Sequence, residues 1–473
     1  MQKLSRSDRP ATMLLLLTMV GGGLAACGGD TTGTATAGSA ALSPTAAAVS
    51  TVAGAMPAAT EAAGAGGDAG ISNKYAGTTL NMVAANHAWN SGIQPLIPEF
   101  EKASGMKINL TSFGETQLSD QLTVKFTAGG SDVDVFMFRP LQEGRLFAGN
   151  GWLSDITAGT QAADMKWSDF QKPAVGTVTF GGKVYGVPIV TEREILYYRK
   201  DLFAAQGIAV PKTLDEMMAA AAKLHNPSGG MYGFVSRGQQ SPAVTQFSSY
   251  LYSMGGDWTK GDQSAIASPE AVKAYKFYGE LLQKYGAPGV LNMNWPQAIA
   301  IFAQGKAAMY TDADSLYPNL LDKTKSQLTP DQIGYAMFPA GAAGAKPYNV
   351  TSWALGIGAS SKNKDAALEF VKWATSQNVV ARLQAGGLPG ARDSVWNSPT
   401  GTKGFPPELA AVIQTSAANG VDHDRPLVVH VSQARDIIGA PIVASIQGQD
   451  VDAAVKSADS QFNDFLKKDV PQK

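Results

Sequence analysis

The fold of this chain is decided by two short apolar segments, Thr79-Leu-Asn-Met-Val-Ala84 and Asp132-Val-Asp-Val-Phe-Met-Phe138. The near-continuous apolar run of the second segment is typical of a strand that is buried on both faces of a parallel sheet. Between the two segments the pattern predicts a helix over Ser91–Ala103, a strand over Lys107–Phe113 and a helix over Gln117–Ala128. This β-α-β-α-β order predicts a doubly wound α/β lobe.

The remainder of the chain is rich in helices, and two of them carry clear start signals. Thr213-Leu-Asp-Glu216 is a capping box that opens a helix ending at Leu224. Ser268-Pro269-Glu270 opens another helix, with proline at its first position and Gly286 beyond its end. Further helices are predicted over Pro296–Gln304, Lys364–Ser376, Pro407–Ala417 and Asp450–Lys467.

The N-terminal residues 1–26 predict an export signal. Lys3, Arg6 and Arg9 precede an apolar run of about ten residues, which is too short to span a bilayer. The run ends in Leu24-Ala-Ala-Cys27, which resembles the lipobox of bacterial lipoproteins, so we expect a diacylglycerol on the thiol of Cys27. The alternative is an ordinary leader followed by a buried free cysteine. Because Cys27 is the only cysteine, no disulfide framework is expected.

Residues 27–75 consist mainly of Ala, Gly, Thr and Ser. A segment with so few large apolar side chains cannot offset the entropy of ordering it, so we expect a flexible tether. The alternative is that this segment is only a spacer and binds no partner. About 400 residues remain, which suits two domain-sized units or one large α/β domain.

Charge and motifs exclude several classes of function. The chain has 38 basic and 39 acidic residues, a balance that favours neither nucleic acid nor an anionic membrane surface. The four histidines lack the HExxH spacing and no second cysteine can join them, so no metal site is expected. No GxSxG, P-loop or Rossmann fingerprint occurs. We therefore expect neither a cofactor nor an enzyme.

Four groups of segments point to a family. They are Gly182-Lys-Val-Tyr-Gly-Val-Pro188 with Leu196-Tyr-Tyr-Arg-Lys-Asp-Leu-Phe203, Gly305-Lys-Ala-Ala-Met309, Trp353-Ala-Leu-Gly-Ile-Gly358 with Ser361-Lys-Asn-Lys-Asp-Ala-Ala-Leu-Glu-Phe-Val371, and Gly387-Leu-Pro-Gly-Ala-Arg392. In this order they resemble the extracellular solute-binding proteins that include the maltose-binding protein. The resemblance covers nearly the whole chain from Gly77 to its end. No single segment is specific, but the four in order are.

The resemblance implies a two-lobed α/β fold of the periplasmic-binding-protein type II, with crossing strands between the lobes and a ligand cleft that closes by hinge motion. The crossings are expected near Pro188–Thr191, Tyr348–Trp353 and Ser394–Gly404. The first lobe would comprise residues 76–190 plus 354–398, and the second lobe residues 191–353 plus 399–473. The resemblance also implies a monomer outside the cytoplasm, anchored by its lipid, that delivers a solute to the permease subunits of an ABC importer.

The residue types in the loops after strands favour a sugar or polyol as the ligand. Aromatic rings stack on the C–H faces of sugars, and planar side chains bind vicinal hydroxyls through two hydrogen bonds. Such loops open onto the cleft in folds of this kind. The candidates are Asn86, His87, Trp89, Glu115, Arg139, Glu192, Arg193, Trp258, Trp295, Asp312, Asp314, Trp353 and Arg392. Glu192 and Trp353 are included because the resemblance places a cleft carboxylate and a sugar contact there.

Several candidates have structural alternatives. Trp89 could pack beneath its own helix, and Glu115 could instead cap the helix that it opens. Glu192 could pair with Arg193, and at least one of Trp258 and Trp295 could belong to the core. Arg139 follows a buried strand and needs a partner, which is either a local carboxylate or a ligand hydroxyl.

One loop departs from the family. Asp312-Ala-Asp314 stands where many relatives have Gly-Pro-Trp, and Ser315 replaces the stacking tryptophan. This departure favours a ligand smaller than a malto-oligosaccharide, although the two carboxylates could merely start a helix. Two other functions remain open. One is the same fold with a polyamine, a peptide or a metal chelate as its cargo, and the other is a secreted enzyme that acts on glycans.

Overall fold

The computed structural model describes residues 71–416 and 420–470, and all of them belong to one compact unit, Val52–Lys473. The predicted signal peptide, Cys27 and the predicted tether up to residue 70 lie outside the described residues. Ile71 and Tyr75 pack against a hydrophobic core, so the last residues of the predicted tether belong to the fold.

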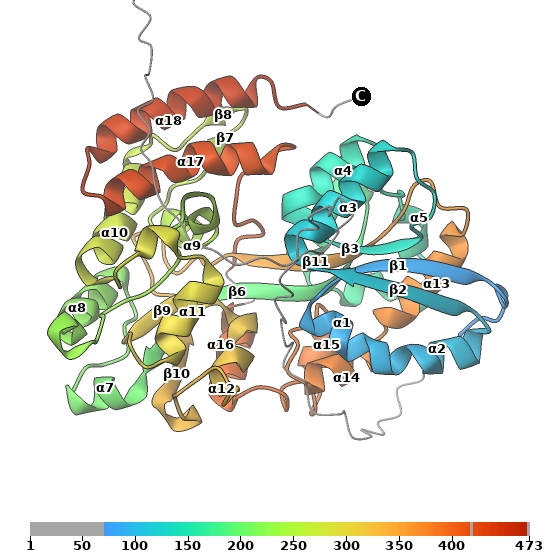
Figure 1. Ribbon diagram of the computed structural model, residues 1–473, viewed down its shortest axis with the longest axis horizontal. Coiled ribbons are helices and arrows are strands. Elements are labelled where there is room, and N and C mark those ends of the chain that lie inside the picture. The colour runs from blue at the N-terminus through green and yellow to red at the C-terminus, as the bar shows by residue number, and fades with distance from the viewer. Residues whose placement is uncertain (1–70, 417–419, 471–473) are drawn as a thin grey trace, which may run out of the picture. The chain divides into compact units, whose positions relative to one another are not determined.

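The central feature is a seven-stranded sheet in the order β10-β6-β11-β3-β1-β2, with β9 paired to β6 (Figure 1). Its strands are β1 (Thr79–Ala85), β2 (Lys107–Phe113), β3 (Val135–Phe138), β6 (Val187–Arg199), β9 (Met309–Ala313), β10 (Ile333–Met337) and β11 (Asn349–Ile357). β1 pairs in parallel with β2 and β3, which confirms the predicted β-α-β-α-β order. Two small hairpins pair β4 (Thr179–Phe180) with β5 (Lys183–Val184) and β7 (Thr259–Lys260) with β8 (Gln263–Ser264).

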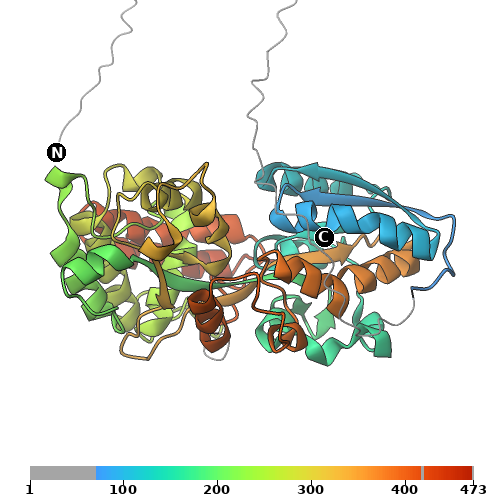
Figure 2. The same cartoon turned by 90° about the horizontal axis from the view of Figure 1, so that it is seen from below.

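Strand β6 contributes to two parts of this sheet. Its residues Val187–Arg193 pair with β11, whereas Glu194–Arg199 pair with β9 and β10. β11 continues from β6 to β3, so these two strands connect the two halves of the molecule, as Figures 1 and 2 show. The crossings predicted near Pro188–Thr191 and Tyr348–Trp353 lie on β6 and β11 respectively.

Two hydrophobic cores lie on either side of these crossing strands. The first core is built on β1, β2 and β3 and includes Phe100, Phe136 and Phe370, and the elements around it form the first lobe. The second core includes Tyr250, Tyr278 and the C-terminal helices, and it defines the second lobe. The chain passes between them a third time, because Ala391 packs in the first core and Trp396 in the second. The two-lobed fold inferred from the sequence is therefore confirmed.

Helices cover the sheet in both lobes. Those before β6 are α1 (Ala88–Ile93), α2 (Ile97–Ser104), α3 (Glu115–Thr127), α4 (Arg145–Gly149), α5 (Thr157–Thr160) and α6 (Lys172–Thr177). Those between β6 and β11 are α7 (Lys200–Ala205), α8 (Leu214–Leu224), α9 (Gln240–Ser253), α10 (Pro269–Tyr285), α11 (Trp295–Ala303) and α12 (Pro318–Leu321). Those after β11 are α13 (Lys364–Ala374), α14 (Gln377–Ala385), α15 (Asp393–Trp396), α16 (Pro407–Ser416), α17 (Val431–Ile446) and α18 (Val451–Leu466).

Shorter helical turns complete the structure. They are η1 (Gln94–Leu96), the π-helix η2 (Pro140–Gly144), η3 (Ala163–Met165), η4 (Trp167–Asp169), η5 (Pro227–Gly229), η6 (Val290–Asn292), η7 (Asp314–Leu316) and η8 (Pro330–Gln332). None of the helices among the described residues combines the length and apolar character that crossing a bilayer requires.

The predicted helix starts are confirmed, whereas some element boundaries differ. Thr213 and Glu216 form the capping box of α8, and the hydroxyl of Ser268 accepts from the backbone N–H of Ala271 at the start of α10. The single helix predicted over Ser91–Ala103 is wrong, because α1, η1 and α2 replace it. Pro95 and Pro98 lie in this stretch, and proline lacks the N–H that a continuous helix needs.

The predicted strand Asp132–Phe138 is also shorter than expected. β3 begins only at Val135, and the Asp134 carboxylate just before it accepts hydrogen bonds from the backbone N–H of Asn81 and the hydroxyl of Ser361. The helix predicted over Lys364–Ser376 ends at Ala374, because the Ser376 hydroxyl instead caps α14.

A buried ion pair lies at the crossing between the lobes. Arg193 on β6 donates to the Asp314 carboxylate at 2.8 Å, and neither side chain is exposed. The same guanidinium donates to the Thr191 hydroxyl at 2.6 Å and to Gln171 at 3.3 Å, and it lies 5.9 Å from the ring of Trp396. Burial raises the pKa of Asp314, and the neighbouring Arg193 counteracts this effect.

We expect Asp314→Ala to destabilise the protein by about 3–5 kcal/mol, because it leaves the Arg193 charge buried without a counter-ion. Urea unfolding of the wild type and the variant measures this difference. Glu280→Ala is the control for losing an ion pair, since Glu280 pairs with Lys284 at the surface and such pairs contribute about 0–1 kcal/mol. A loss for Asp314→Ala that is no larger than the loss for the control would contradict the role of the pair.

Candidate functional site

A cavity of about 1530 Å³ is lined by residues of both lobes. The first lobe contributes Asn86 and His87, which follow β1, Glu115 at the start of α3, and Arg139, which follows β3. These are the loops at the carboxyl ends of strands, where the cleft was predicted. The volume exceeds the usual 300–1,000 Å³ of a ligand pocket, as expected for a cleft that is open to solvent.

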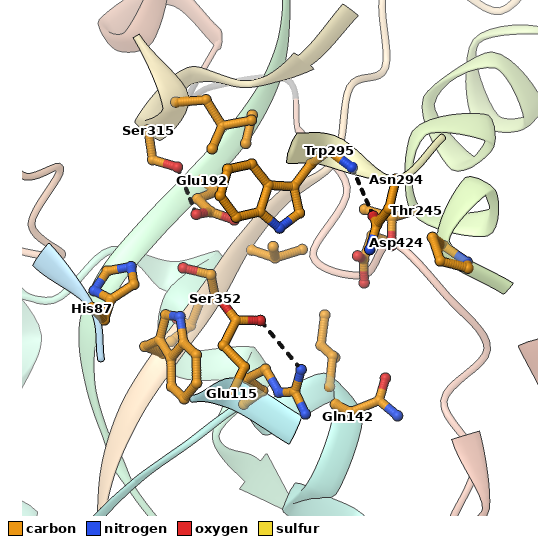
Figure 3. A pocket seen from close by; sticks show the side chains of 18 of the residues that line it. His87, Glu115, Gln142, Glu192, Thr245, Asn294, Trp295, Ser315, Ser352 and Asp424 are labelled. Atoms are coloured by element: carbon orange, nitrogen blue, oxygen red, sulfur yellow. Dashed lines mark hydrogen bonds and ion pairs between the residues drawn. The ribbon is translucent and has the colours of Figure 1, made fainter. Parts of the chain in front are cut away.

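Two tryptophans reach this cavity from opposite lobes. Trp353 on β11 is 4% exposed and lies 5.6 Å from the ring of His87 and 5.7 Å from the guanidinium of Arg139. Trp295 is the first residue of α11, and its backbone N–H donates to the Asn294 side chain. Figure 3 shows the indole of Trp295 extending into the cavity, with Glu115 and Gln142 on the far side. Trp295 therefore presents the more accessible aromatic surface.

Glu192 of β6 is a carboxylate in the wall of the cavity. Its Oε1 accepts a hydrogen bond of 2.6 Å from the hydroxyl of Ser315 (Figure 3). Burial raises its pKa to about 7, and nearby Asp314 and Asp312 add to the effect while the Ser315 hydrogen bond opposes it. Glu192 thus changes its charge close to neutral pH, and its remaining oxygen can accept hydrogen bonds from a hydroxyl group.

Arg237 lines the same cavity and is held in place from behind. Its Nε and Nη2 donate to the two oxygens of Asp312 at 3.0 and 2.5 Å. Asp312 also accepts from Tyr310 and Gln246, so this carboxylate is fully occupied by protein groups. The Nη1 group of Arg237 has no hydrogen-bond partner among the described residues, and it is therefore available to a ligand oxygen.

His87 is a neutral hydrogen-bond donor at the cavity wall. Its Nδ1 accepts the backbone N–H of Trp89 at 3.1 Å and so caps α1. Burial lowers the pKa of His87 to about 4, so the ring is uncharged at neutral pH. Because Nδ1 is an acceptor, the proton resides on Nε2.

The lobes also touch at a further point of the cavity. Gln142 of η2, in the first lobe, accepts hydrogen bonds at its Oε1 from Arg425 at 2.6 Å and Arg435 at 3.2 Å, both in the second lobe. Its Nε2 donates to the hydroxyl of Ser432 at 3.0 Å. Gln142 therefore bridges the lobes outside the crossing strands.

The cavity brings together seven of the thirteen residues predicted from the sequence. They are Asn86, His87, Glu115, Arg139, Glu192, Trp295 and Trp353. Glu115 follows the N-cap Gly114 and lies 3.7 Å from Arg139, which also pairs with Glu143. The alternative that Glu192 pairs with Arg193 is not realised, because Arg193 pairs with Asp314.

Two predicted tryptophans are absent from the lining and belong to the cores. Trp89 is 1% exposed and packs in the first core, under the helix that it helps to start. Trp258 is 1% exposed and packs in the second core, with its ring 5.7 Å from that of Phe247. Their place in the predicted site is therefore corrected, because the apolar ring surface of each is already buried against protein.

Four predicted charged residues are corrected for a different reason, since protein groups already satisfy them. Arg193 and Asp314 neutralise each other, and Asp312 holds Arg237. Arg392 donates to the backbone oxygens of Thr375 and Met165 and stacks on a phenylalanine ring at 4.1 Å. None of the four lines the cavity, and Asp312 supports it indirectly by holding Arg237.

The sequence reasoning missed several residues of the lining. They include Gln142, Arg237, Thr245, Asn294, Ser352, Asp424, Arg425 and Arg435. A signal existed for Arg237, because it follows the buried pair Phe234-Val235, and Val235 forms a bridge with Tyr310. Asp424 and Arg425 lie in a loop without a strand before them, so the rule of strand-following loops could not find them. Within residues 71–416 and 420–470, no three His, Cys, Asp or Glu side chains are grouped as metal ligands.

Comparison with known proteins places this geometry in context. The family model described as bacterial extracellular solute-binding protein matches residues 84–380. The mannitol-binding protein of Pseudomonas aeruginosa is 30% identical over 69% of this chain and 74% of its own length. Two solved structures are also similar. An Agrobacterium radiobacter K84 solute-binding protein in complex with ribitol has a TM-score of 0.73 at 27% identity, and it covers 82% of this chain and 99% of its own. Maltose-bound MalE3 of T. maritima has a TM-score of 0.72 at 26% identity and covers 82% and 100%.

The raised pKa of Glu192 predicts a dependence of stability on pH. Below its ordinary pKa of 4.5 the Glu192 carboxyl is protonated in both the folded and the unfolded protein, and above about pH 7 it is ionised in both. Ionising Glu192 costs more free energy in the folded protein than in the unfolded protein. This difference lowers stability fully above about pH 7 and not at all below the ordinary pKa. We expect the wild type to lose stability relative to Glu192→Gln as the pH rises through this window.

Thermal melts of both proteins across this pH range measure the effect. Glu280→Gln, at an exposed position, controls for the substitution itself. Parallel melting curves for the wild type and Glu192→Gln at every pH would show that Glu192 titrates normally.

Proposed function

Because the chain belongs to the family of bacterial extracellular solute-binding proteins, we propose that its cleft captures a small polyol or sugar and delivers it to the permease of an ABC importer. The resemblance inferred from the sequence is thereby confirmed. The observation that carries the choice of ligand is the convergence of Trp295, Glu192 and Arg237 on one cavity. The mannitol-binding and ribitol-bound relatives support the same class of ligand.

Each of these groups suits a chain of vicinal hydroxyls. Glu192 accepts hydrogen bonds, Arg237 donates them through Nη1, and the indole of Trp295 covers the C–H side of the ligand. The family resemblance implies a stacking tryptophan where this chain has Ser315, and the Ser315 hydroxyl instead donates to Glu192. This arrangement supports a short polyol or monosaccharide over a malto-oligosaccharide.

Binding without chemistry is the second part of the proposal. A glycosidase needs one carboxyl group as an acid and a second as a base or nucleophile at a defined separation of about 5–10 Å. Two carboxylates near Glu192 are each held by an arginine, Asp312 by Arg237 and Asp314 by Arg193. Incubation with a panel of glycans tests this, and release of product would favour the enzyme instead.

We further propose that Cys27 carries a lipid that anchors the protein to the membrane outside the cytoplasm. The lipobox sequence Leu24-Ala-Ala-Cys27 supports this assignment. Cys27→Ala should move the protein from the membrane fraction to the soluble fraction and change its processing, which fractionation and gel mobility measure. Unchanged mobility and membrane association would contradict lipidation at this residue.

Calorimetry with ribitol, D-mannitol, D-glucose and spermidine tests the ligand class. We expect a polyol or the sugar to bind, and Trp295→Ala and Glu192→Ala each to weaken that binding by about 1–3 kcal/mol, which is roughly ten- to a hundred-fold. Thermal melts of the free variants accompany the titrations, because Trp295 also packs against the second core and Glu192 has a pKa raised by burial. Affinities are compared at a temperature where each variant is folded.

Glu280→Ala, an exposed carboxylate outside the cavity, is the matched control for Glu192→Ala. If spermidine is the only compound that binds, the ligand class is a polyamine and the polyol proposal is wrong. Full affinity in both cavity variants would move the ligand away from Trp295 and Glu192.

A further inference from the structure

Arg435 differs from the other arginines of the cavity. Arg139 pairs with Glu143, Arg237 with Asp312 and Arg425 with Asp424. Arg435 of α17 bonds only neutral oxygens. These are the backbone oxygen of Ser241 at 2.9 Å, Gln142 Oε1 at 3.2 Å and the Thr245 hydroxyl at 3.2 Å. Among the described arginines of the lining it alone lacks an ion pair with a carboxylate.

Arg425 and Arg435 form a guanidinium pair around shared acceptors. Arg425 also donates to Gln142 Oε1, at 2.6 Å, and to the Thr245 hydroxyl, at 3.3 Å. Both oxygens of Asp424 are engaged by Arg425. Two positive charges therefore face one negative charge at this part of the cavity, and one positive charge is left without compensation.

The surroundings make that uncompensated charge costly. Burial lowers the pKa of Arg435 well below its ordinary value, and Arg425, Arg237 and Arg139 lower it further, while Asp424 acts in the opposite direction. Arg435 is half-buried at the cavity wall. A half-buried charge without a counter-ion retains part of its desolvation cost, and a bound anion would offset that part. Arginine pairs are also suited to carboxylates, because their N–H groups match the two oxygens.

The position of the pair makes it accessible to a ligand of the main site. Gln142, Thr245, Asp424, Arg425 and Arg435 all line the cavity that contains Trp295 and Glu192. Figure 3 labels Gln142, Thr245 and Asp424 among the side chains that line it. The amide oxygen of Gln142 bridges the two guanidiniums, and it comes from the other lobe. A carboxylate oxygen is a stronger acceptor than this amide and can take its place.

We propose that Arg425 and Arg435 form a subsite for the carboxylate end of a polyol acid, such as an aldonate. This inference rests on the proposed function and adds a charged end group to its ligand. One negative charge matches the single uncompensated positive charge, whereas a phosphate dianion would exceed it. The hydroxyls of the same ligand would lie toward Glu192, Arg237 and Trp295.

Calorimetry with D-mannonate and D-mannitol, which differ at one end of the chain, tests the subsite. We expect the wild type to bind mannonate at least about tenfold more tightly than mannitol, the increment of a charge-assisted hydrogen bond. Arg435→Gln should remove this preference and change mannitol affinity less than about threefold. Arg382→Gln, a surface arginine paired with Glu99 outside the cavity, is the matched control.

The outcomes separate the two proposals. Binding of mannitol with equal or weaker binding of mannonate to the wild type overturns the subsite and leaves the proposed function intact. Equal losses for both ligands in Arg435→Gln also overturn it, because Arg435 would then serve the polyol chain. Failure of mannitol, mannonate, ribitol and glucose to bind overturns the proposed function together with the subsite. Even if Arg435→Gln does not fold, the wild-type comparison can still overturn the subsite, and Arg425→Gln then provides the second variant.

Discussion

The structure depends on one strand that is shared between two lobes. β6 carries charged residues through the region between two hydrophobic cores. Each of these charges must be paired, reach solvent or be neutralised by protonation. Alternate side chains of a strand point to opposite faces, so Arg193 faces away from Glu192 and Glu194. Arg193 is neutralised by Asp314, Glu192 reaches the cavity, and Glu194 is fully buried with a strongly raised pKa. A carboxylate that lines the cavity is thus built into the strand that joins the lobes.

This placement links ligand contact to the geometry of the lobes. Glu192 lies on the crossing strand, whereas its partner Ser315 follows β9 in the second lobe. Trp353 reaches the cavity from the other crossing strand, β11. A ligand held by these residues bears directly on the strands about which the lobes would rotate. Gln142 connects the lobes outside the crossing strands, and it does so through hydrogen bonds alone.

Much of the fold was predictable because it depends on local signals. The apolar run before Arg139, the capping box at Thr213 and the N-cap at Ser268 are all properties of neighbouring residues. The single helix predicted from Ser91 is wrong because the prediction followed the apolar periodicity, whereas Pro95 and Pro98 interrupt the helix in the structure. Strand-following loops also located Asn86, Glu115 and Arg139 correctly at the cavity, because the topology alone brings those loops to one edge.

The remaining site residues depend on contacts that residue type cannot reveal. Asp312 and Glu192 are both carboxylates near β6, yet Asp312 is surrounded by Arg237, Tyr310 and Gln246, and only Glu192 reaches the cavity. Choosing between them requires the positions of Arg237 and Gln246, which lie 75 and 66 residues away from Asp312. Whether a charged residue near the site can contact a ligand therefore depends on which protein groups already neutralise it. Glu192 and Arg237 are the candidates for ligand contact because both line the cavity and protein groups leave part of each of them unoccupied.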